Sequence, residues 1–362
     1  MFVAWRDLRF AKGRFALMGT VIVLITLLVG LLSGLTAGLG QQNISAITGL
    51  PANKIAFQAP SGGQDLSYSN STVTEAQWRQ WSQAPGVDSA EPLGITTTKA
   101  TAGDRSAAVS AFGVEPGSRL APHSDKITSG AVVLSTAAAD DLGVRAGGSL
   151  TLAGQPVTVA AVEGEAHFSH TPVIWTSLDT WRRAAPPTGG GQGPTATVIA
   201  LTTTSQADTA AIDQQAGTTT VSVDDSLAAI GSYTSENGSL QLMRGFLFAI
   251  SALVVGAFFT VWTIQRSGDV AVLKALGAST AGLLKDALGQ AVVLLAGGTL
   301  TGTGIAAALG ALVSGSAVPF LLTPATVLVP AAVIVLLGVL GAALSIRRIT
   351  AVDPLTALGN LR

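Results

Sequence analysis

The chain has 362 residues, of which 48% are hydrophobic and only 11% are charged. Average soluble domains carry about 25% charged residues, so this composition excludes an ordinary water-soluble protein and indicates an integral membrane protein. The net charge of -1 conceals an asymmetry, because residues 40–240 hold 17 Asp and Glu against 9 Lys and Arg, whereas the remainder holds 4 against 11. The chain has no cysteine, which excludes disulfides, thiolate metal sites and cysteine nucleophiles.

The basic residues outside the acidic region gather beside the apolar runs. Cytoplasmic loops of membrane proteins carry an excess of Lys and Arg, so both termini and the loop at 265–286 are predicted to be cytoplasmic. The acidic middle must then lie outside. We expect a multi-pass protein of the cell membrane, in contact with lipid and without a nucleic-acid partner. The flanking basic residues are Arg6, Arg9, Lys12, Arg14, Arg266, Lys274, Lys285, Arg347 and Arg348.

The first 40 residues predict an interfacial helix that leads into the first transmembrane helix. Residues 1–14 read as a basic helix at the inner interface, and residues 15–40 are uncharged and long enough to span the membrane. A signal peptide is the rival interpretation, but its apolar core would be only about 7–15 residues long. Gly30, Gly34 and Gly38 recur at every fourth position, which fits either a packing seam or glycines that a membrane helix merely tolerates.

Residues 41–238 predict an extracytoplasmic α+β domain. Division of this domain into two lobes is one open possibility. A helix is expected at 74–83, and residues 142–164 resemble a small hairpin or barrel module. The run PPTGGGQG at 186–193 reads as a flexible insert. Further strands are expected at 105–114, 130–135, 148–164, 170–177 and 195–203.

The second span is predicted at 239–266, including a stalk. Residues 245–265 form an uncharged run between Arg244 and Arg266, which as a helix crosses about 30 Å of hydrocarbon. Apolar positions at helical spacing then predict a short amphipathic cytoplasmic helix at 267–284, with Gly277 as its C-cap. A helix continuous with the outer domain would transmit movement from one side of the membrane to the other.

Two more spans follow, at 285–317 and 323–346, and residues 347–362 form a cytoplasmic tail. Pro319 and Pro324 mark a short external reversal between these spans. The predicted fold class is therefore a membrane protein with four transmembrane α-helices and an α+β extracytoplasmic domain inserted between helices 1 and 2.

No motif for catalysis is present. None of the six lysines follows a glycine, so the sequence lacks a phosphate loop, and neither HExxH nor GxSxG occurs. The segment GEAHFSH at 164–170 holds two histidines and one acid, which fits either a surface metal site or a solvated loop. We expect a protein that is not an enzyme and has no cofactor of its own.

Two segments carry a resemblance to a known family. RSGDVAVLKALGAST at 266–280 and RRITAVDPLTAL at 347–358 are similar to motifs of the MacB and FtsX class of ABC transporter permeases, often called type VII. The resemblance implies a homodimer that works with a dimer of cytoplasmic ABC ATPase subunits, which bind ATP and Mg²⁺. It also implies that residues 268–279 dock on the ATPase, although an interfacial amphipathic helix would show the same pattern. The implied apolar contacts are Val270, Leu273 and Leu276, and the implied polar contacts are Asp269 and Lys274.

Within this class the chain most resembles the haem-efflux permeases of Gram-positive bacteria, through its small outer domain and the start WRDLRFAKGRFALMG. The resemblance implies export of haem as a transported ligand. Without cysteine, the axial ligand must be His, Met, Tyr or a carboxylate. Glu236 and Met243 share a helical face near Tyr233 and Arg244, which makes these four the candidate haem-binding residues. The alternative is a snorkelling arginine beside ordinary packing residues.

Two rival functions remain open at this point. The first keeps transport but changes the cargo to a macrolide, a peptide or a lipid. The second is a transmembrane regulator, since relatives of FtsX control cell-wall hydrolases. An apolar slot would favour transport, whereas a complex with an extracellular hydrolase would favour regulation.

Overall fold

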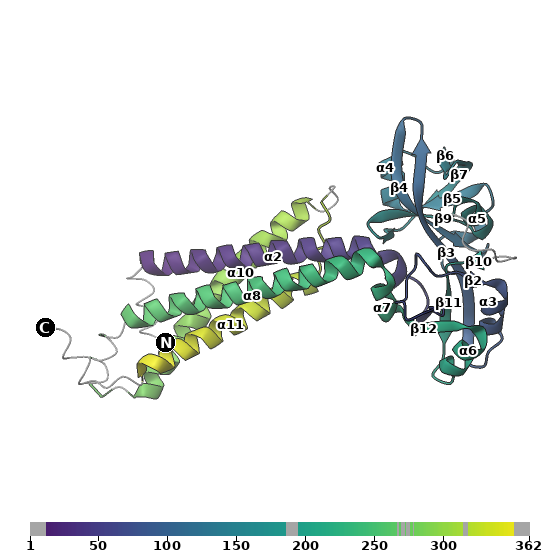
Figure 1. The fold of residues 1–362 in the computed structure, drawn as a ribbon. Helices are drawn as coiled ribbons and strands as arrows, with labels where there is room; N and C mark the ends of the chain where they lie inside the picture. Colours follow the sequence, from purple (N-terminus) through teal and green to yellow (C-terminus); the bar gives the residue numbers. More distant parts are fainter. Residues whose placement is uncertain are drawn as a thin grey trace. The chain divides into compact units, whose positions relative to one another are not determined.

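The computed structural model describes residues 12–185, 195–265, 268, 272, 276–277, 279–313 and 318–350. The chain forms two compact units: Met1–Gly38 together with Ser239–Arg362, and Leu39–Gly238 (Figure 1). The predicted interfacial helix up to residue 11, the insert at 186–193 and the tail from residue 351 lie outside the described residues.

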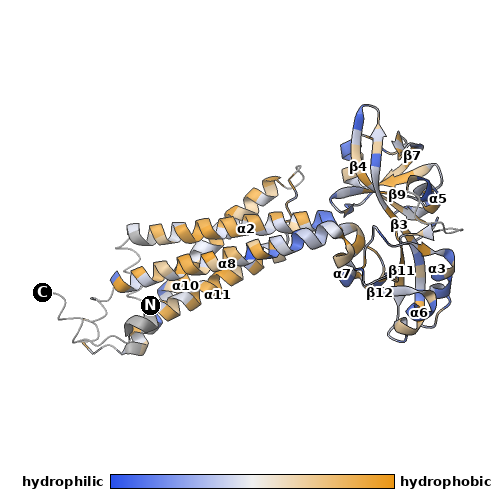
Figure 2. Cartoon of the chain, in the orientation of Figure 1, coloured by the Kyte–Doolittle hydropathy of each residue, from blue (hydrophilic) through white to orange (hydrophobic). Residues whose placement is uncertain are grey.

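The first unit contains the membrane helices. Among the described residues four helices are long and apolar enough to span a membrane, which confirms the predicted fold class. Hydrophobic residues follow these helices along most of their length (Figure 2). Helices α2 and α8 also continue into the second unit, beyond the predicted limits of their spans. The helices are α2 (Lys12–Thr48), α8 (Gly231–Gln265), α10 (Thr280–Val313) and α11 (Pro324–Thr350).

The glycine repeat of α2 is a packing seam, which decides between the two interpretations of the sequence. A Cβ added to Gly34 would lie 2.2 Å from the ring of Phe320, and one added to Gly38 would lie 2.0 Å from the backbone oxygen of Pro319. The amide of Leu321 donates to the carbonyl of Gly34 at 3.0 Å. Residues 319–321, between α10 and α11, therefore rest directly on the backbone of α2.

Helix α10 approaches α2 through glycines of its own. A Cβ at Gly298 would lie 2.7 Å from the side chain of Ile22, and one at Gly302 would lie 2.6 Å from the carbonyl of Val23. Helices in lipid gain nothing from hydrophobic exclusion of water, so close backbone approach and dispersion hold them together. The buried core of this unit comprises Met18, Ile22, Val255, Phe259, Trp262, Ala291, Leu295 and Ala342.

The second unit is the predicted α+β domain. Among the residues that the structure describes, its main sheet has ten strands in the order β12-β1-β11-β3-β4-β9-β5-β7-β6, with β8 paired to β9, and β10 pairs separately with β2. The strands are β1 (Lys54–Gln58), β2 (Val73–Thr74), β3 (Val87–Ala102), β4 (Arg105–Val114), β5 (Ala131–Leu134), β6 (Ser149–Leu152), β7 (Gln155–Val162), β8 (His167–Phe168), β9 (Thr171–Ser177), β10 (Thr195–Ala196), β11 (Val198–Thr203) and β12 (Thr218–Ser222).

The strand β3 organises this sheet. Its first half pairs with β11, and its second half pairs with β4. It also pairs with β6 through Ala100 and Thr101, which closes β3, β4, β9, β5, β7 and β6 into a barrel. The module predicted at 142–164 supplies β6 and β7 to this barrel. The sequence analysis missed β3, because Pro92 and Gly94 interrupt its strand pattern.

Short helices cover the sheet, and several of them begin at a capping side chain. Ser135 caps α4, Ser177 caps α5 and Asp208 caps α6, each by accepting a hydrogen bond from a backbone amide. The helix expected at 74–83 is α3. The helices of the domain are α3 (Glu75–Ser82), α4 (Thr136–Leu142), α5 (Leu178–Ala184), α6 (Thr209–Ala216) and α7 (Val223–Ser226), with 3₁₀ turns at Ser124–Lys126 and Leu227–Ala229.

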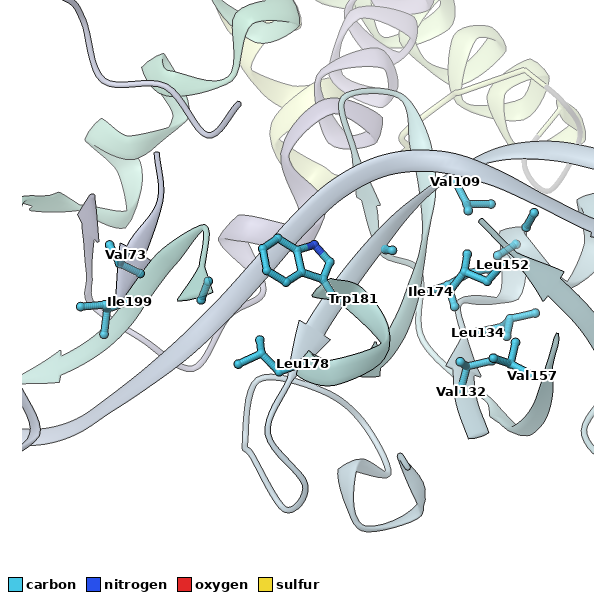
Figure 3. Packing of buried hydrophobic residues seen from close by; sticks show 14 of the residues in the cluster. Val73, Val109, Val132, Leu134, Leu152, Val157, Ile174, Leu178, Trp181 and Ile199 are labelled. Atoms are coloured by element: carbon cyan, nitrogen blue, oxygen red, sulfur yellow. The ribbon is translucent and has the colours of Figure 1, made fainter. Parts of the chain in front are cut away.

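Trp181 of α5 locks its helix onto the sheet. Its side chain lies over two glycines, because a Cβ added to Gly94 would lie 2.3 Å from the indole and one added to Gly113 would lie 2.5 Å from Trp181 Cβ. Figure 3 shows Trp181 and Leu178 with the other apolar side chains of this buried cluster. The glycine that weakens the strand pattern of β3 is thus required by the packing of α5.

The seam predicts opposite effects for two glycine substitutions in α2. Gly38→Ala would overpack the contact with Pro319 and should lower the free energy of unfolding by about 1–3 kcal/mol. Gly19→Ala is the matched control, because nothing lies within 4 Å of an added Cβ, and alanine should stabilise the helix by about 0.5–1 kcal/mol. Tryptophan fluorescence during thermal unfolding in detergent measures both. Equal midpoints for the two variants would contradict the seam.

Candidate functional site

A strained turn lies in the outer domain between β8 and β9. Its two residues, Ser169 and His170, have φ of 51° and 65° although neither is glycine. Two-residue hairpins favour Asn-Gly or Gly-Gly here, because a Cβ in the left-handed region costs roughly 1–2 kcal/mol per residue. Such strain persists only where the surrounding structure enforces it, and it concentrates at functional sites.

Aromatic packing anchors the strand that leads into this turn. The ring of Phe168 lies edge-on to Tyr68 and to Phe112, with centroid separations of 5.5 and 5.8 Å. Tyr68 is buried, and its hydroxyl donates to Ser226 Oγ at 2.9 Å. Burial raises the pKa of Tyr68 above its ordinary value, since the phenolate would be poorly solvated. β8 therefore has a fixed position in the domain core.

The end of α2 holds the turn by its backbone. The amides of Ser169 and His170 donate to the carbonyls of Asn43 and Gln42, at 3.0 and 3.1 Å. Ser45 Oγ accepts from the amide of His167 at 2.9 Å. These bonds satisfy the backbone amides of His167, Ser169 and His170, and they offset the strain of the turn.

The side chains at this point form a cluster of four, which we call the outer polar cluster: Asn43, His170, Ser232 and Glu236. His170 Nε2 lies 2.8 and 3.0 Å from the two carboxylate oxygens of Glu236. The amide of Asn43 donates to the same carboxylate at 3.4 Å, and Ser232 Oγ donates to Asn43 Oδ1 at 2.6 Å. A second serine contact links Ser232 Oγ to Ser169 Oγ at 2.8 Å. The end of α2 and the β8–β9 turn thus meet at one carboxylate of a third segment, α8.

Burial differs sharply within this cluster. Asn43 is 1% exposed, whereas the side chains of His170 and Glu236 are 30% and 45% exposed. Water screens an ion pair of that exposure, so its contribution to stability is small. The exposed carboxylate remains accessible to a ligand, while its supports are fixed by the domain.

The other histidines of the domain have different surroundings. Burial lowers the pKa of His167, and the nearby carboxylates of Glu165 and Asp141 oppose that shift. His123 Nε2 pairs with Glu163 at 2.5 Å. Among the described residues no three His, Asp or Glu side chains are grouped to hold a metal ion, so GEAHFSH contributes His170 to the outer polar cluster instead.

The four predicted haem-binding residues divide between the two units. In the outer unit, Tyr233 is partly buried against the domain core, and Glu236 belongs to the outer polar cluster. In the membrane unit, Met243 is 47% exposed, and Arg244 donates to Thr36 Oγ1 of α2 at 3.4 Å. The arginine is thus held by a polar group of the first span. Asn43 and His170 were missing from the predicted set, since 127 residues separate them in the chain.

Of the predicted ATPase contacts, only Leu276 lies within the described residues. Its side chain is 79% exposed, and its amide donates to the carbonyl of Val272 at 3.0 Å, which is a helical hydrogen bond. Gly277 follows with φ of 92°, as expected of a glycine that ends a helix. Asp269, Val270, Leu273 and Lys274 lie outside the described residues.

Two families match this chain in succession. Residues 15–219 match the family described as MacB-like periplasmic core domain, and residues 242–354 match the FtsX-like permease C-terminal family. The chain belongs to the MacB/FtsX class of ABC transporter permeases. Its four membrane helices and inserted outer domain therefore serve a permease, a class of subunit that is not itself an enzyme.

Relatives of the permease match it along its whole length. It is 25% identical over 371 residues to a Staphylococcus haemolyticus protein named "Putative hemin transport system permease protein HrtB", covering 100% of both chains. It is 24% identical over 371 residues to an uncharacterized ABC transporter permease of Mycobacterium tuberculosis, covering 99% of each. The periplasmic region of MacB from Actinobacillus actinomycetemcomitans superposes with a TM-score of 0.34 at 15% identity, over 49% of this chain and 92% of that one.

The lowered pKa of His167 predicts a pH dependence of stability. Because the folded state binds its proton less readily than the unfolded state, stability should fall as the pH drops below the ordinary value of 6.5. His167→Gln removes this titration, so the wild type should lose more thermal stability than the variant between pH 7.5 and about pH 5.5. Parallel losses in both proteins would show that His167 does not couple folding to protonation.

Proposed function

We propose that this permease is the membrane subunit of an efflux pump that exports haem from the membrane. The observation that carries the proposal is the full-length similarity to relatives named as hemin transport permeases. The exposed carboxylate of Glu236 supports it, because it offers a ligand atom on the outer domain. The energy would come from ATP hydrolysed by a separate cytoplasmic subunit dimer.

Haem demands an iron ligand, an apolar surface and a cation. Glu236 and Met243 would supply ligand atoms for the iron, Arg244 would pair with a propionate, and Tyr233 would complete the set. Arg244 is supported by Thr36, so its guanidinium stays on α8 near the first span. Exposed apolar side chains continue along α8 and offer the surface that a porphyrin requires: Leu242, Phe246, Ile250 and Leu253.

The transport cycle would be mechanical. The sequence has no phosphate loop, so ATP and Mg²⁺ would bind to the partner subunits. Residues 268–279 of each copy in a homodimer would dock on the ATPase, with both termini in the cytoplasm. Closure of the ATPase dimer would move α8, a single helix from Gly231 to Gln265, and expel the cargo outward.

A haem titration of the detergent-purified permease tests the cargo. We expect saturable binding at about one haem per dimer, with the absorption spectrum of ligated iron. Glu236→Ala and Met243→Ala should each weaken binding at least tenfold, since each removes a ligand atom. Leu242→Ala is the matched control, because its 62% exposed side chain neighbours Met243 and holds no ligand atom.

The titration tests whether haem is the cargo, and either result leaves the chain a permease of the MacB/FtsX class. Absence of saturable binding would contradict haem as cargo and favour another lipophilic molecule, such as a macrolide, a peptide or a lipid. Capture of a cell-wall hydrolase by the outer domain, with no transport, would favour the regulator.

The mechanical proposal makes its own prediction. The wild type has no cysteine, so Leu253→Cys introduces a unique labelling site, at a residue that is 72% exposed on α8. Spin labels there, in the permease reconstituted with its ATPase, should change their separation across the dimer when ATP replaces ADP. An unchanged distance distribution would contradict transmission through α8.

A further inference from the structure

We infer that His170 is a positioning residue, which fixes the Glu236 carboxylate in the orientation that binds a metal-bearing cargo. The inference rests on the proposed haem export and deepens it. It assigns a role to a residue outside the predicted ligand set, and it makes the strained turn part of the binding site.

The strain of the turn is the first argument. Glycine would adopt the backbone of residue 170 without steric cost, but a histidine occupies it with φ of 65°. What the position gains from histidine is the imidazole, and its Nε2 is directed at the carboxylate of Glu236. A solvent-screened ion pair stabilises a domain too little to account for such a residue, so the placement of the carboxylate is the better explanation.

The geometry of the carboxylate also favours a positioning role. A glutamate on the surface of a helix can adopt many rotamers, and ordering it for a ligand would cost conformational entropy. Here His170 Nε2 spans both oxygens, at 2.8 and 3.0 Å, and the amide of Asn43 approaches one of them at 3.4 Å. A carboxylate has about four lone-pair positions, so these donors leave acceptor sites for an iron atom.

The groups that support the carboxylate are themselves held by hydrogen bonds. Asn43 is 1% exposed and accepts a hydrogen bond from Ser232, and the backbone amide of His170 is bonded to Gln42. Metal-binding sites commonly hold their ligands in this way, through hydrogen-bond partners that do not touch the metal themselves. The supporting side chains, His170 and Asn43, lie on the β8–β9 turn and on α2, and the carboxylate that they hold lies on α8.

The domain contains a natural control for this arrangement. His123 also has a positive φ, of 47°, and its Nε2 also pairs with a glutamate, Glu163. Both of these side chains are well exposed, at 40% and 56%. Substitution of His123 therefore reproduces the loss of an imidazole and the relief of backbone strain, without touching Glu236.

The test is a haem titration of the full-length permease carrying His170→Gly, His170→Gln or His123→Gly. Glycine keeps the turn without strain, so His170→Gly should unfold within a few degrees of the wild type. It should nevertheless bind haem about tenfold more weakly, with a shifted absorption spectrum of the ligated iron. His170→Gln retains a donor that can reach a carboxylate and should recover part of the affinity. His123→Gly should match the wild type in affinity and spectrum.

Each contrary result has a distinct meaning. If His170→Gly binds haem with unchanged affinity and spectrum while Glu236→Ala does not bind, the positioning role is overturned and haem export stands. If Glu236→Ala also binds normally, the carboxylate is not the ligand and the positioning role is overturned with it. A wild type without saturable binding overturns both the cargo and the positioning role.

Discussion

The structure depends on one constraint of the lipid bilayer: backbone polar groups inside hydrocarbon must be satisfied within the segment, so each span is a helix. Two of these helices, α2 and α8, do not end with their apolar stretches but continue into the outer domain. Their polar ends carry Asn43, Ser232 and Glu236, which would be costly in lipid and are hydrogen-bonded to one another in the domain. A continuous hydrogen-bonded helix is stiff along its axis, which is the property that the proposed movement of α8 relies on.

The same solvent explains how the membrane unit is packed. Lipid provides no hydrophobic force between helices, and close contact must replace it. The glycines of α2 and α10 allow that contact, because Phe320 and Pro319 reach the backbone of α2 at Gly34 and Gly38. The outer domain, in water, follows the opposite rule, with large side chains such as Trp181 and Phe57 buried in its cores. The chain therefore brings α2 and α10 together at glycines, whereas large side chains fill the cores of its outer domain.

The outer polar cluster connects the fold to the proposed transport. The hairpin of β8 and β9 contributes an imidazole, α2 contributes an amide, and α8 contributes the carboxylate that they hold. The backbone strain at Ser169 and His170 is retained because the aromatic core beneath Phe168 and the carbonyls of α2 fix both sides of the turn. The cluster consequently holds one exposed carboxylate in place, as the proposed cargo site requires.

The sequence alone determined the membrane helices, the inserted outer domain and the class of permease, because apolar length, charge asymmetry and the motif after the second span are local properties of the chain. It also identified Glu236 as a candidate ligand from helical spacing. Only the tertiary structure decided that the α2 glycines form a seam, that β3 closes a barrel, and that Asn43 and His170 meet Glu236. The contact between Asn43 and Glu236 alone joins residues 193 positions apart, and no local pattern in a sequence encodes a pairing between such distant segments.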